Sequence, residues 1–211
     1  FVNVNTLATQ LASSDVTLAT STDGGDITLG SALAWNSGNT LRLNSGSNIN
    51  LNASVTAASG GLSLYAGKAS PGDPQHGVNP IFARIQQDAG TTIHVGTLTI
   101  GQNTAANVAG ATPNNPVTSG STFLDGTVTA GALQLDLSGN LGGVFAPTAT
   151  NRIGALRTIN SGGTLLGDLS VVNGSGALDV MLAAPASSAA SVRVVTPGAL
   201  TLENGTNLSF A

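Results

Sequence analysis

The triplet Ile27-Thr28-Leu29 returns 22 residues later as Ile49-Asn50-Leu51, and both are apolar–polar–apolar. Such an alternation with a period of two is typical of a β-strand that buries one face. Three further pairs of triplets recur at spacings of 21, 23 and 22 residues: 41–43 with 62–64, 169–171 with 192–194, and 178–180 with 200–202. Two interleaved series with one repeat length indicate a chain that winds, completing one coil about every 22 residues. The sequence therefore predicts a solenoid of stacked short strands.

The composition suits narrow coils. Charged residues make up only 8 % of the 211 residues and aromatic residues 3 %, whereas glycine occurs 28 times; an average globular protein is about 25 % charged. Small residues can turn tight corners, and aliphatic side chains of medium size can fill a thin core. At 41 % hydrophobic residues the chain can bury such a core. We expect one domain over residues 1–211.

The charge balance excludes some classes of partner. With a net charge of −4 and only six Lys and Arg residues, the chain is not expected to bind nucleic acid, which needs clustered cations against phosphates. No apolar run approaches the roughly 20 residues that span a bilayer, so we expect no membrane-spanning segment. The absence of cysteine is compatible with export, and a chain beginning at Phe1 is expected to be a mature segment or a piece of a longer protein.

Turn clusters of Gly, Asn, Asp and Ser separate the expected strands. These strands cover 16–19, 27–29, 40–43, 48–53, 62–65, 92–95, 97–100, 127–130, 132–137, 154–159, 167–172, 177–182, 191–195, 199–202 and 206–210. Residues 1–5 also alternate like a strand, residues 6–12 could cap the end of the core, and no stretch of 12 residues predicts a helix. Loop insertions are expected near 66–91, 101–122 and 140–151, with a possible short strand near 82–86. In a solenoid such loops commonly carry recognition.

Two runs near the amino terminus have a familiar form: Gly25-Asp26-Ile27-Thr28-Leu29-Gly30 and Ala34-Trp35-Asn36-Ser37-Gly38-Asn39-Thr40-Leu41. Together with 15–20, 46–53, 152–156 and 162–171 they resemble filamentous-haemagglutinin-like secreted proteins, which are bacterial two-partner-secretion exoproteins and autotransporter-type adhesins. The resemblance implies a right-handed parallel β-helix and export with the help of an outer-membrane secretion partner. It also implies an extracellular or cell-surface location, a role in adhesion or biofilm, and host or biofilm glycans or surface proteins as partners.

The titratable residues do not form a recognisable catalytic or metal-binding pattern. Asp125 and Asp136 lie 11 residues apart, as do Asp168 and Asp179. Half a coil places the members of each pair on different faces, whereas two carboxylates that hydrolyse a glycosidic bond lie roughly 5–10 Å apart. The two histidines, His76 and His94, lack the spacing of metal ligands. We therefore expect no catalysis, no metal and no cofactor.

Candidate binding residues lie in the first insertion. Lys68 and His76 fall within 66–91 and are the predicted contacts for a ligand. Four aromatic residues could stack on sugar rings, although packing on the core is the expected role: Trp35, Tyr65, Phe82 and Phe123. Four asparagines occupy glycosylation sequons but are expected mainly to form turns and ladders: Asn52, Asn173, Asn204 and Asn207.

These observations predict a non-catalytic shaft and binding scaffold of a bacterial secreted or surface adhesin. An alternative is a self-assembling extracellular filament, because a solenoid with unprotected terminal coils can pair end to end into a homopolymer. The carboxyl-terminal residues 208–211 show no amphipathic cap, which favours either continuation or stacking. A polysaccharide-cleaving β-helix enzyme is the less favoured third reading.

Overall fold

The structure, a computed structural model, describes residues 2–20, 25–67, 83–102, 119–139, 141–160, 162–163, 165, 167–182 and 191–202. These residues form the helix α1 (Val4–Leu11) and the strands β1 (Val16–Ala19), β2 (Ile27–Leu29), β3 (Leu33–Ala34), β4 (Thr40–Ser45), β5 (Ile49–Leu51), β6 (Val55–Ala66), β7 (Ala83–Gln87), β8 (Thr92–Gln102), β9 (Ser119–Leu124), β10 (Thr127–Asp136), β11 (Val144–Ala146), β12 (Arg152–Ile159), β13 (Leu169–Val172), β14 (Leu178–Met181), β15 (Val192–Val195) and β16 (Leu200–Leu202).

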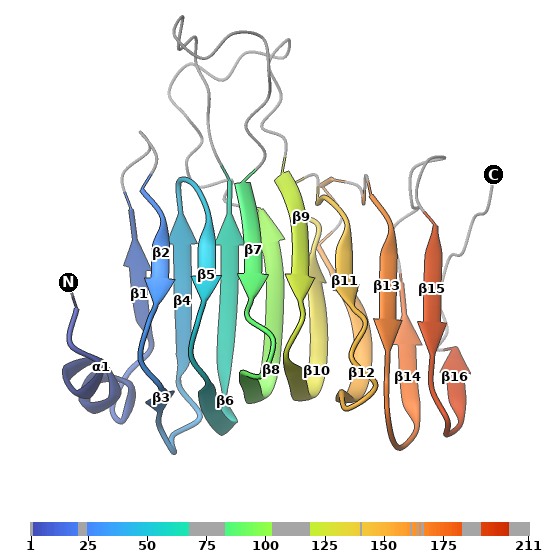
Figure 1. Cartoon of the computed structure of the whole chain (residues 1–211), viewed down its shortest axis with the longest axis horizontal. Helices are drawn as coiled ribbons and strands as arrows, with labels where there is room; N and C mark the ends of the chain where they lie inside the picture. The colour runs from blue at the N-terminus through green and yellow to red at the C-terminus, as the bar shows by residue number, and fades with distance from the viewer. Residues whose placement is uncertain are drawn as a thin grey trace, which may run out of the picture.

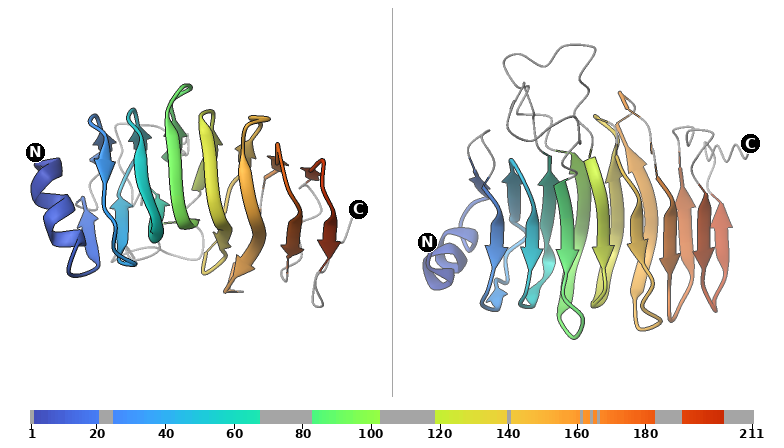
Figure 2. Two further views of the ribbon diagram at one scale, coloured as in Figure 1. Left: turned by 90° about the horizontal axis from the view of Figure 1, so that it is seen from below. Right: turned by 45° about the horizontal axis from the view of Figure 1, so that its top comes forward.

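The strands form two entirely parallel sheets, and the chain alternates between them. Sheet A has the order β1-β4-β6-β8-β10-β12-β14-β16, with β3 also paired to β6, and sheet B has the order β2-β5-β7-β9-β11-β13-β15. In Figure 1 the strands of sheet B run downward in front and those of sheet A run upward behind, while the chain advances from left to right. The winding is therefore a right-handed parallel β-helix, and Figure 2 shows its coils stacked along one axis from α1 onward.

The strand register confirms the repeat that the sequence predicts. Ile27 pairs with Ile49 in sheet B and Leu41 pairs with Leu62 in sheet A. Near the other end, Leu169 pairs with Val192 and Leu178 with Leu200. The two members of each of the four pairs of triplets are thus neighbours in space, one coil apart. With the seven strands of sheet B stacked at about 4.8 Å, the coils extend over roughly 30 Å.

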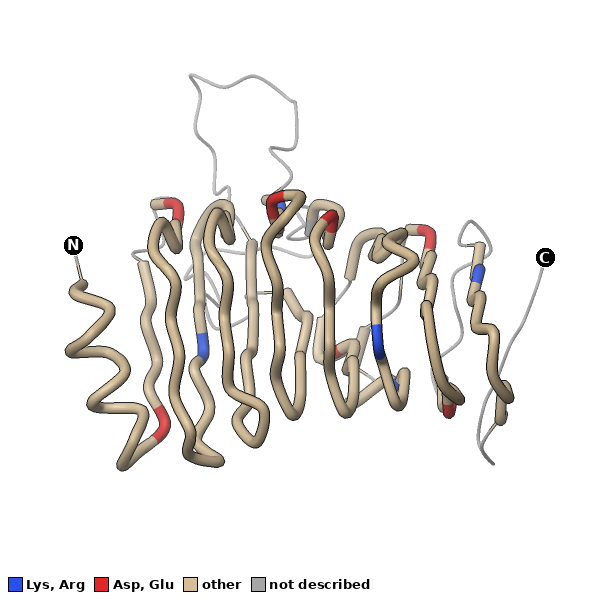
Figure 3. Tube along the Cα trace, turned by 60° about the horizontal axis from the view of Figure 1, so that its bottom comes forward, with Lys and Arg blue, Asp and Glu red and all other residues tan. Residues whose placement is uncertain are grey.

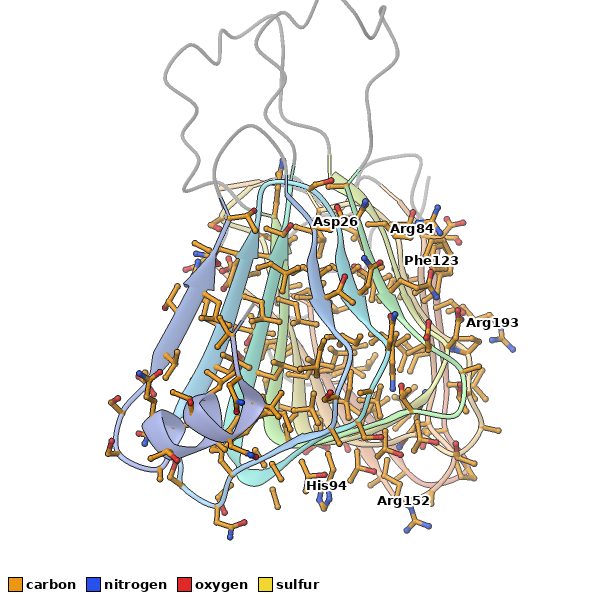
Figure 4. The ribbon with its side chains drawn as sticks, turned by 60° about the vertical axis from the view of Figure 1, so that its left-hand side comes forward. Asp26, Arg84, His94, Phe123, Arg152 and Arg193 are labelled. Carbon is orange, nitrogen blue, oxygen red and sulfur yellow. The ribbon has the colours of Figure 1, made fainter. Side chains whose placement is uncertain are left out.

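The long strands β6, β8, β10 and β12 of sheet A bend and so give their coils a third, short side. Pairing of β6 with β8 shifts register between Ala57 and Gly61, and Figure 4, which looks partly along the axis, shows three sides in the cross-section. Glycines stack at this bend because the coils approach closely there. A Cβ on Gly131 would lie 2.8 Å from the carbonyl oxygen of Gly96, and one on Gly154 would lie 2.8 Å from that of Gly131.

One hydrophobic cluster runs through the stacked coils, from Leu7 in α1 to Leu182 after β14. Its members are mainly Leu, Ile and Val that point inward at every second position of the strands, as in β5, where Ile49 and Leu51 flank the outward Asn50. The apolar–polar alternation therefore buries one face of each sheet on a shared thin core. This continuity makes every coil depend on its neighbours.

The amino-terminal end of the core is closed by α1, where the sequence predicted a strand over residues 1–5. Asn3 caps this helix, because its side-chain oxygen accepts from the backbone N–H of Asn5 at 2.8 Å and of Thr6 at 3.4 Å. Leu7 and Leu11, four residues apart on one helix face, are buried in the core cluster. The strand prediction was therefore wrong for residues 4 and 5, and the possible cap over 6–12 is confirmed.

Two insertions leave the β-helix at the same corner of successive coils. The last register partners before them are Ala66 and Gln102, and the first partners after them are Ala83 and Ser119. Residues 68–82 and 103–118 lie outside the described residues. β7 matches the short strand predicted near 82–86, and the range 140–151, predicted to loop out, contains β11, which pairs with both β9 and β13 in sheet B.

Candidate binding surface on sheet B

The structure describes only some of the residues that the sequence predicted as ligand contacts. Lys68, His76 and Phe82 lie outside the described residues, so the first insertion is known only by the points where it leaves and returns. Trp35 and Tyr65 are 4 % and 5 % exposed. The Trp35 ring nitrogen donates to the carbonyl of Asn39 at 2.9 Å. For these two aromatic residues the expected packing role is confirmed.

Phe123 differs from the other aromatic candidates because it lies on the outer face of sheet B (Figure 4). It is the register partner of Phe145 in the next coil. The two rings stack with their centroids 5.3 Å apart and their planes 12° from parallel. Both side chains are only partly buried. Phe145 was not among the predicted binding residues, although its separation of 22 residues from Phe123 equals one coil and could have revealed the pair.

Polar side chains of β7 and the following turns cover one face of this aromatic pair. The Arg84 guanidinium carbon lies 5.8 Å from the centroid of the Phe123 ring, and Arg84 is exposed (Figure 4). Gln86, the register partner of Phe123, donates from Nε2 to Oδ2 of Asp125 at 2.6 Å. A cation over a ring face is attracted by the ring quadrupole. The Phe123 face toward β7 therefore already has a partner.

The opposite face of the pair belongs to Phe145 and is turned toward β13. The ring of Phe145 lies over Gly143, because a Cβ built on that glycine would lie 2.7 Å from a ring carbon. In the next coil the register partner of Phe145 is Ser170, a small residue, and the partner of Ser170 one coil further is Arg193. Ser170 thus forms a low step between an aromatic ring and an exposed arginine.

A carboxylate lies at one side of this step. Asp168 directly precedes β13, and its Oδ1 accepts from the backbone N–H of Ser191 at 2.9 Å and from the Ser191 hydroxyl at 2.7 Å. These two hydrogen bonds lower the pKa of the exposed Asp168 carboxyl below 3.8. Asp168 is therefore ionised at neutral pH and can accept hydrogen bonds from hydroxyl groups.

A second polar cluster lies on sheet A. Gly101 is the register partner of both Tyr65 and Asp136, and the Tyr65 side chain reaches across this glycine to Asp136, two coils away. The Tyr65 hydroxyl donates to Asp136 Oδ2 at 2.8 Å, while Oδ1 accepts from Asn160 Nδ2 at 2.8 Å and from the Ser138 N–H at 2.9 Å. Burial would raise the pKa of Asp136, but the hydrogen bonds from Asn160, Tyr65 and Ser138 outweigh it and hold the pKa below 3.8.

The hydrogen bond that lowers the pKa of Asp136 raises the pKa of Tyr65. Burial and the hydrogen bond to Asp136 raise the pKa of Tyr65 to about 12. The Arg42 guanidinium carbon lies 3.9 Å from the centroid of the Tyr65 ring and covers it. Both carboxylate oxygens of Asp136 are engaged, and with Arg42 the cluster joins side chains from four coils, on β4, β6 and β10 and directly after β12.

Buried amides hold the turns that follow sheet B. Asn151 is 0 % exposed, and its Oδ1 accepts from the N–H of Val128 in the preceding coil at 2.8 Å. Asn173 repeats the arrangement one coil later by accepting from the N–H of Ile153 at 2.8 Å. Asn173 is 1 % exposed, which confirms the ladder role and makes its sequon inaccessible in the folded state. Asn52 is exposed, whereas Asn204 and Asn207 lie outside the described residues.

The carboxylate pairs considered for catalysis are split between the sheets. Asp125 follows β9 of sheet B and Asp136 ends β10 of sheet A, and likewise Asp168 precedes β13 of sheet B while Asp179 lies in β14 of sheet A. In the part of the chain that the structure describes, no three His, Cys, Asp or Glu side chains are grouped as metal ligands. The charged residues are sparse and separated along the coils (Figure 3).

His94 and Arg152 project from the short side of the coil (Figure 4). They pair with the same residue, Thr129, from opposite sides. The helix α1, with eight residues, is the one helix in the described part of the chain, and it falls well short of the roughly 20 apolar residues that a membrane-spanning helix needs.

No family model, curated protein or solved structure matches the chain.

Proposed function

We propose that the chain is a shaft segment of a bacterial secreted or cell-surface adhesin of the filamentous-haemagglutinin-like type. In this role it is a rigid, non-catalytic scaffold that presents binding surfaces to glycans or surface proteins of a host or biofilm. The observation that carries the proposal is the single hydrophobic cluster that continues through all the stacked coils, with outward faces that are polar but rarely charged. A continuous core and parallel backbone ladders resist bending and local opening, which a shaft requires.

Two details support a presenting role in addition to a structural one. The insertions at 68–82 and 103–118 leave from register partners in neighbouring coils and return to register partners. The points where the two insertions leave and return are therefore adjacent on the rigid coils, and insertions in such a scaffold commonly carry recognition. The aromatic pair of Phe123 and Phe145 lies on β9 and β11 of sheet B, and β9 begins where the second insertion returns.

The location and the adhesive role can be tested together. Antibodies raised against the purified chain should label intact cells of the organism that encodes it, or detect the protein in the culture medium. Deletion of the gene should reduce attachment of these cells to a surface or to one another. Detection of the protein only after cell lysis would contradict the proposal.

A second candidate is a filament subunit, and one observation favours it. The last described coil exposes apolar side chains: Val195 is 40 %, Leu200 48 % and Leu202 56 % exposed. Among the described residues no further strand pairs with the outer edges of β15 and β16, and such edges can add another strand. At the other end, however, α1 covers the core with Leu7 and Leu11, so a head-to-tail contact would have to displace it.

Light scattering of the purified chain over a wide concentration range, combined with negative-stain microscopy, distinguishes the two candidates. The shaft proposal predicts discrete short particles at every concentration. Fibres of uniform width that lengthen with concentration would favour the filament.

A further inference from the structure

The outer face of sheet B combines an aromatic ring with hydroxyl, carboxylate and guanidinium groups on three successive coils. Phe145, Ser170 and Arg193 occupy one outward-facing column, because Phe145 pairs with Ser170 and Ser170 pairs with Arg193. Asp168 is exposed beside this column. From this arrangement we propose that the step between Phe145 and Arg193 is a binding subsite for a neutral pyranose ring of a glycan. The inference rests on the proposed binding role and assigns it a place and a ligand class.

The dimensions of the step fit one sugar ring. Neighbouring strands lie about 4.8 Å apart, so the backbones that carry Phe145 and Arg193 are separated by roughly 10 Å. Ser170 is too short to fill this interval. The C–H groups on one face of a pyranose can pack flat on the Phe145 ring, and its other face then lies toward Arg193.

Only one face of the aromatic pair is available for this contact. The Phe123 face is approached by Arg84 at 5.8 Å, which leaves too little space for a sugar between them. Phe123 instead supports Phe145 from behind through the 5.3 Å stack. A ring held by a second ring loses little conformational freedom when a ligand binds, so the platform is preorganised.

The polar groups around the step suit hydroxyl groups. Asp168 accepts hydrogen bonds, Arg193 donates them, and the Ser170 hydroxyl can do either. The hydrogen bonds from Ser191 fix Asp168 Oδ1 in place, so the carboxylate is oriented before a ligand arrives. Ser170 lies one coil from Phe145, Arg193 lies two coils away and Asp168 lies beside Ser170, so all three groups are on the side of the ring where a stacked pyranose would lie.

Charge favours a neutral over an acidic glycan. The chain carries a net charge of −4, and Asp168 would repel a carboxylate or sulfate bound at the step. Arg193 is the one cation in the column of Phe145, Ser170 and Arg193. One Arg beside one Asp gives no net attraction for an anion, but both groups can hydrogen-bond hydroxyls.

Binding can be measured with defined probes. Cellohexaose, galactohexaose and mannohexaose are each titrated into the whole chain and followed by ligand-observed NMR, with a heparin hexasaccharide as the acidic comparison. A single hexose subsite of this size is expected to bind with a dissociation constant of about 1 mM. At least one neutral hexasaccharide should bind, and the heparin hexasaccharide should bind more weakly.

Two variants test whether binding occurs at this step. Phe145→Ala removes the platform, and Ser170→Leu fills the step while leaving both rings in place; each should weaken binding by about tenfold or more. Asn50→Leu is the matched control, because Asn50 is outward-facing in the same column on β5, away from the aromatic pair. Unfolding temperatures identify any variant that misfolds, and if Phe145→Ala does so, Ser170→Leu decides.

Three results would overturn the inference: no binding of any neutral probe, binding of the heparin hexasaccharide alone, or unchanged binding by folded Ser170→Leu. None of these would contradict the shaft proposal, which depends on surface location and attachment. Conversely, a protein found only inside cells would refute the shaft proposal while leaving a measured saccharide contact at Phe145 in place.

Discussion

Replacing Asn151 with alanine should destabilise the β-helix far more than the same change at an outward asparagine. Asn151 is 0 % exposed and joins three coils: Oδ1 accepts from Val128 N–H at 2.8 Å, and Nδ2 donates to the carbonyls of Ala146 and Val172, both at 3.1 Å. At roughly 0.5–1.5 kcal/mol for each hydrogen bond, their loss costs about 3 kcal/mol. Val128 is also 0 % exposed, so its N–H, left without an acceptor, raises the expected total to roughly 3–5 kcal/mol.

The matched control is Asn50→Ala on the outer face of β5. On an exposed surface, Asn50 donates a long hydrogen bond to Thr28 Oγ1 at 3.4 Å and also hydrogen-bonds the exposed Asp26 carboxylate. Its removal should change the free energy of unfolding by no more than about 0.5 kcal/mol. Both variants are unfolded in urea and followed by far-ultraviolet circular dichroism and by the fluorescence of Trp35. A loss at Asn151→Ala below about 1 kcal/mol, or one equal to that of Asn50→Ala, would refute the assignment of the buried amides as the ties between coils.

Three further predictions concern the corner glycines, the tyrosine and the helical cap. Gly131→Ala should cost about 1–3 kcal/mol in urea unfolding, because its Cβ would lie 2.8 Å from a backbone carbonyl, whereas Gly30→Ala, with no atom within 4 Å, should be nearly neutral; equal effects would contradict the close approach. Tyr65 is the single tyrosine of the chain, so phenolate absorbance should titrate near pH 12 in the folded protein, and nearer 10 in Asp136→Asn. Because folding raises this pKa, the associated stability is fully present below pH 10 and is lost as the pH rises toward 12; a midpoint near 10 in the unmodified chain would argue against the Tyr65–Asp136 contact. Leu11→Asp places a charge at a fully buried position and should detach α1, lowering the unfolding temperature and promoting association in light scattering, and an unaffected monomer would show that α1 is not the cap.

The strands that the sequence predicts are those with a clear alternation and a turn on either side. The triplets at 27–29 and 49–51 show this best. Each inward position needs an aliphatic residue because it faces the core, and this requirement does not depend on which residue lies beside it in the next coil. β3 has only two residues, β11 is apolar at all three of its positions, and β9 lies within the predicted insertion over 101–122 except for its last two residues, so these three strands were not predicted. α1 was missed because it has only eight residues and buries only two leucines on the core. A stripe of two apolar residues is too short to indicate a helix in the sequence.

The binding surface was harder to predict because it depends on register between coils. The stacking of Phe123 on Phe145 follows from their separation of one coil, but the prediction of an insertion over 140–151 left Phe145 out of the repeat. The bond from Tyr65 to Asp136 spans 71 residues and two insertions, whose lengths the local pattern does not constrain. Outward residues also lack the strong apolar signal of the core, so their partners appear only once the coils are stacked.

The most direct test of this account is disulfide cross-linking between coils, since the chain has no cysteine of its own. Asn50 and Gln86 are register partners across the first insertion, so their Cα atoms lie about 5 Å apart, within reach of a disulfide. Thr28 and Gln86 are two rungs apart, at roughly 10 Å, which is beyond that reach. The account predicts that the double-cysteine variant at 50 and 86 oxidises to an intramolecular disulfide under mild conditions, seen by mass spectrometry, while the variant at 28 and 86 stays reduced. Failure of the first pair to close, or equal closure of both, would contradict a parallel β-helix in which the chain returns to the next coil after the insertion.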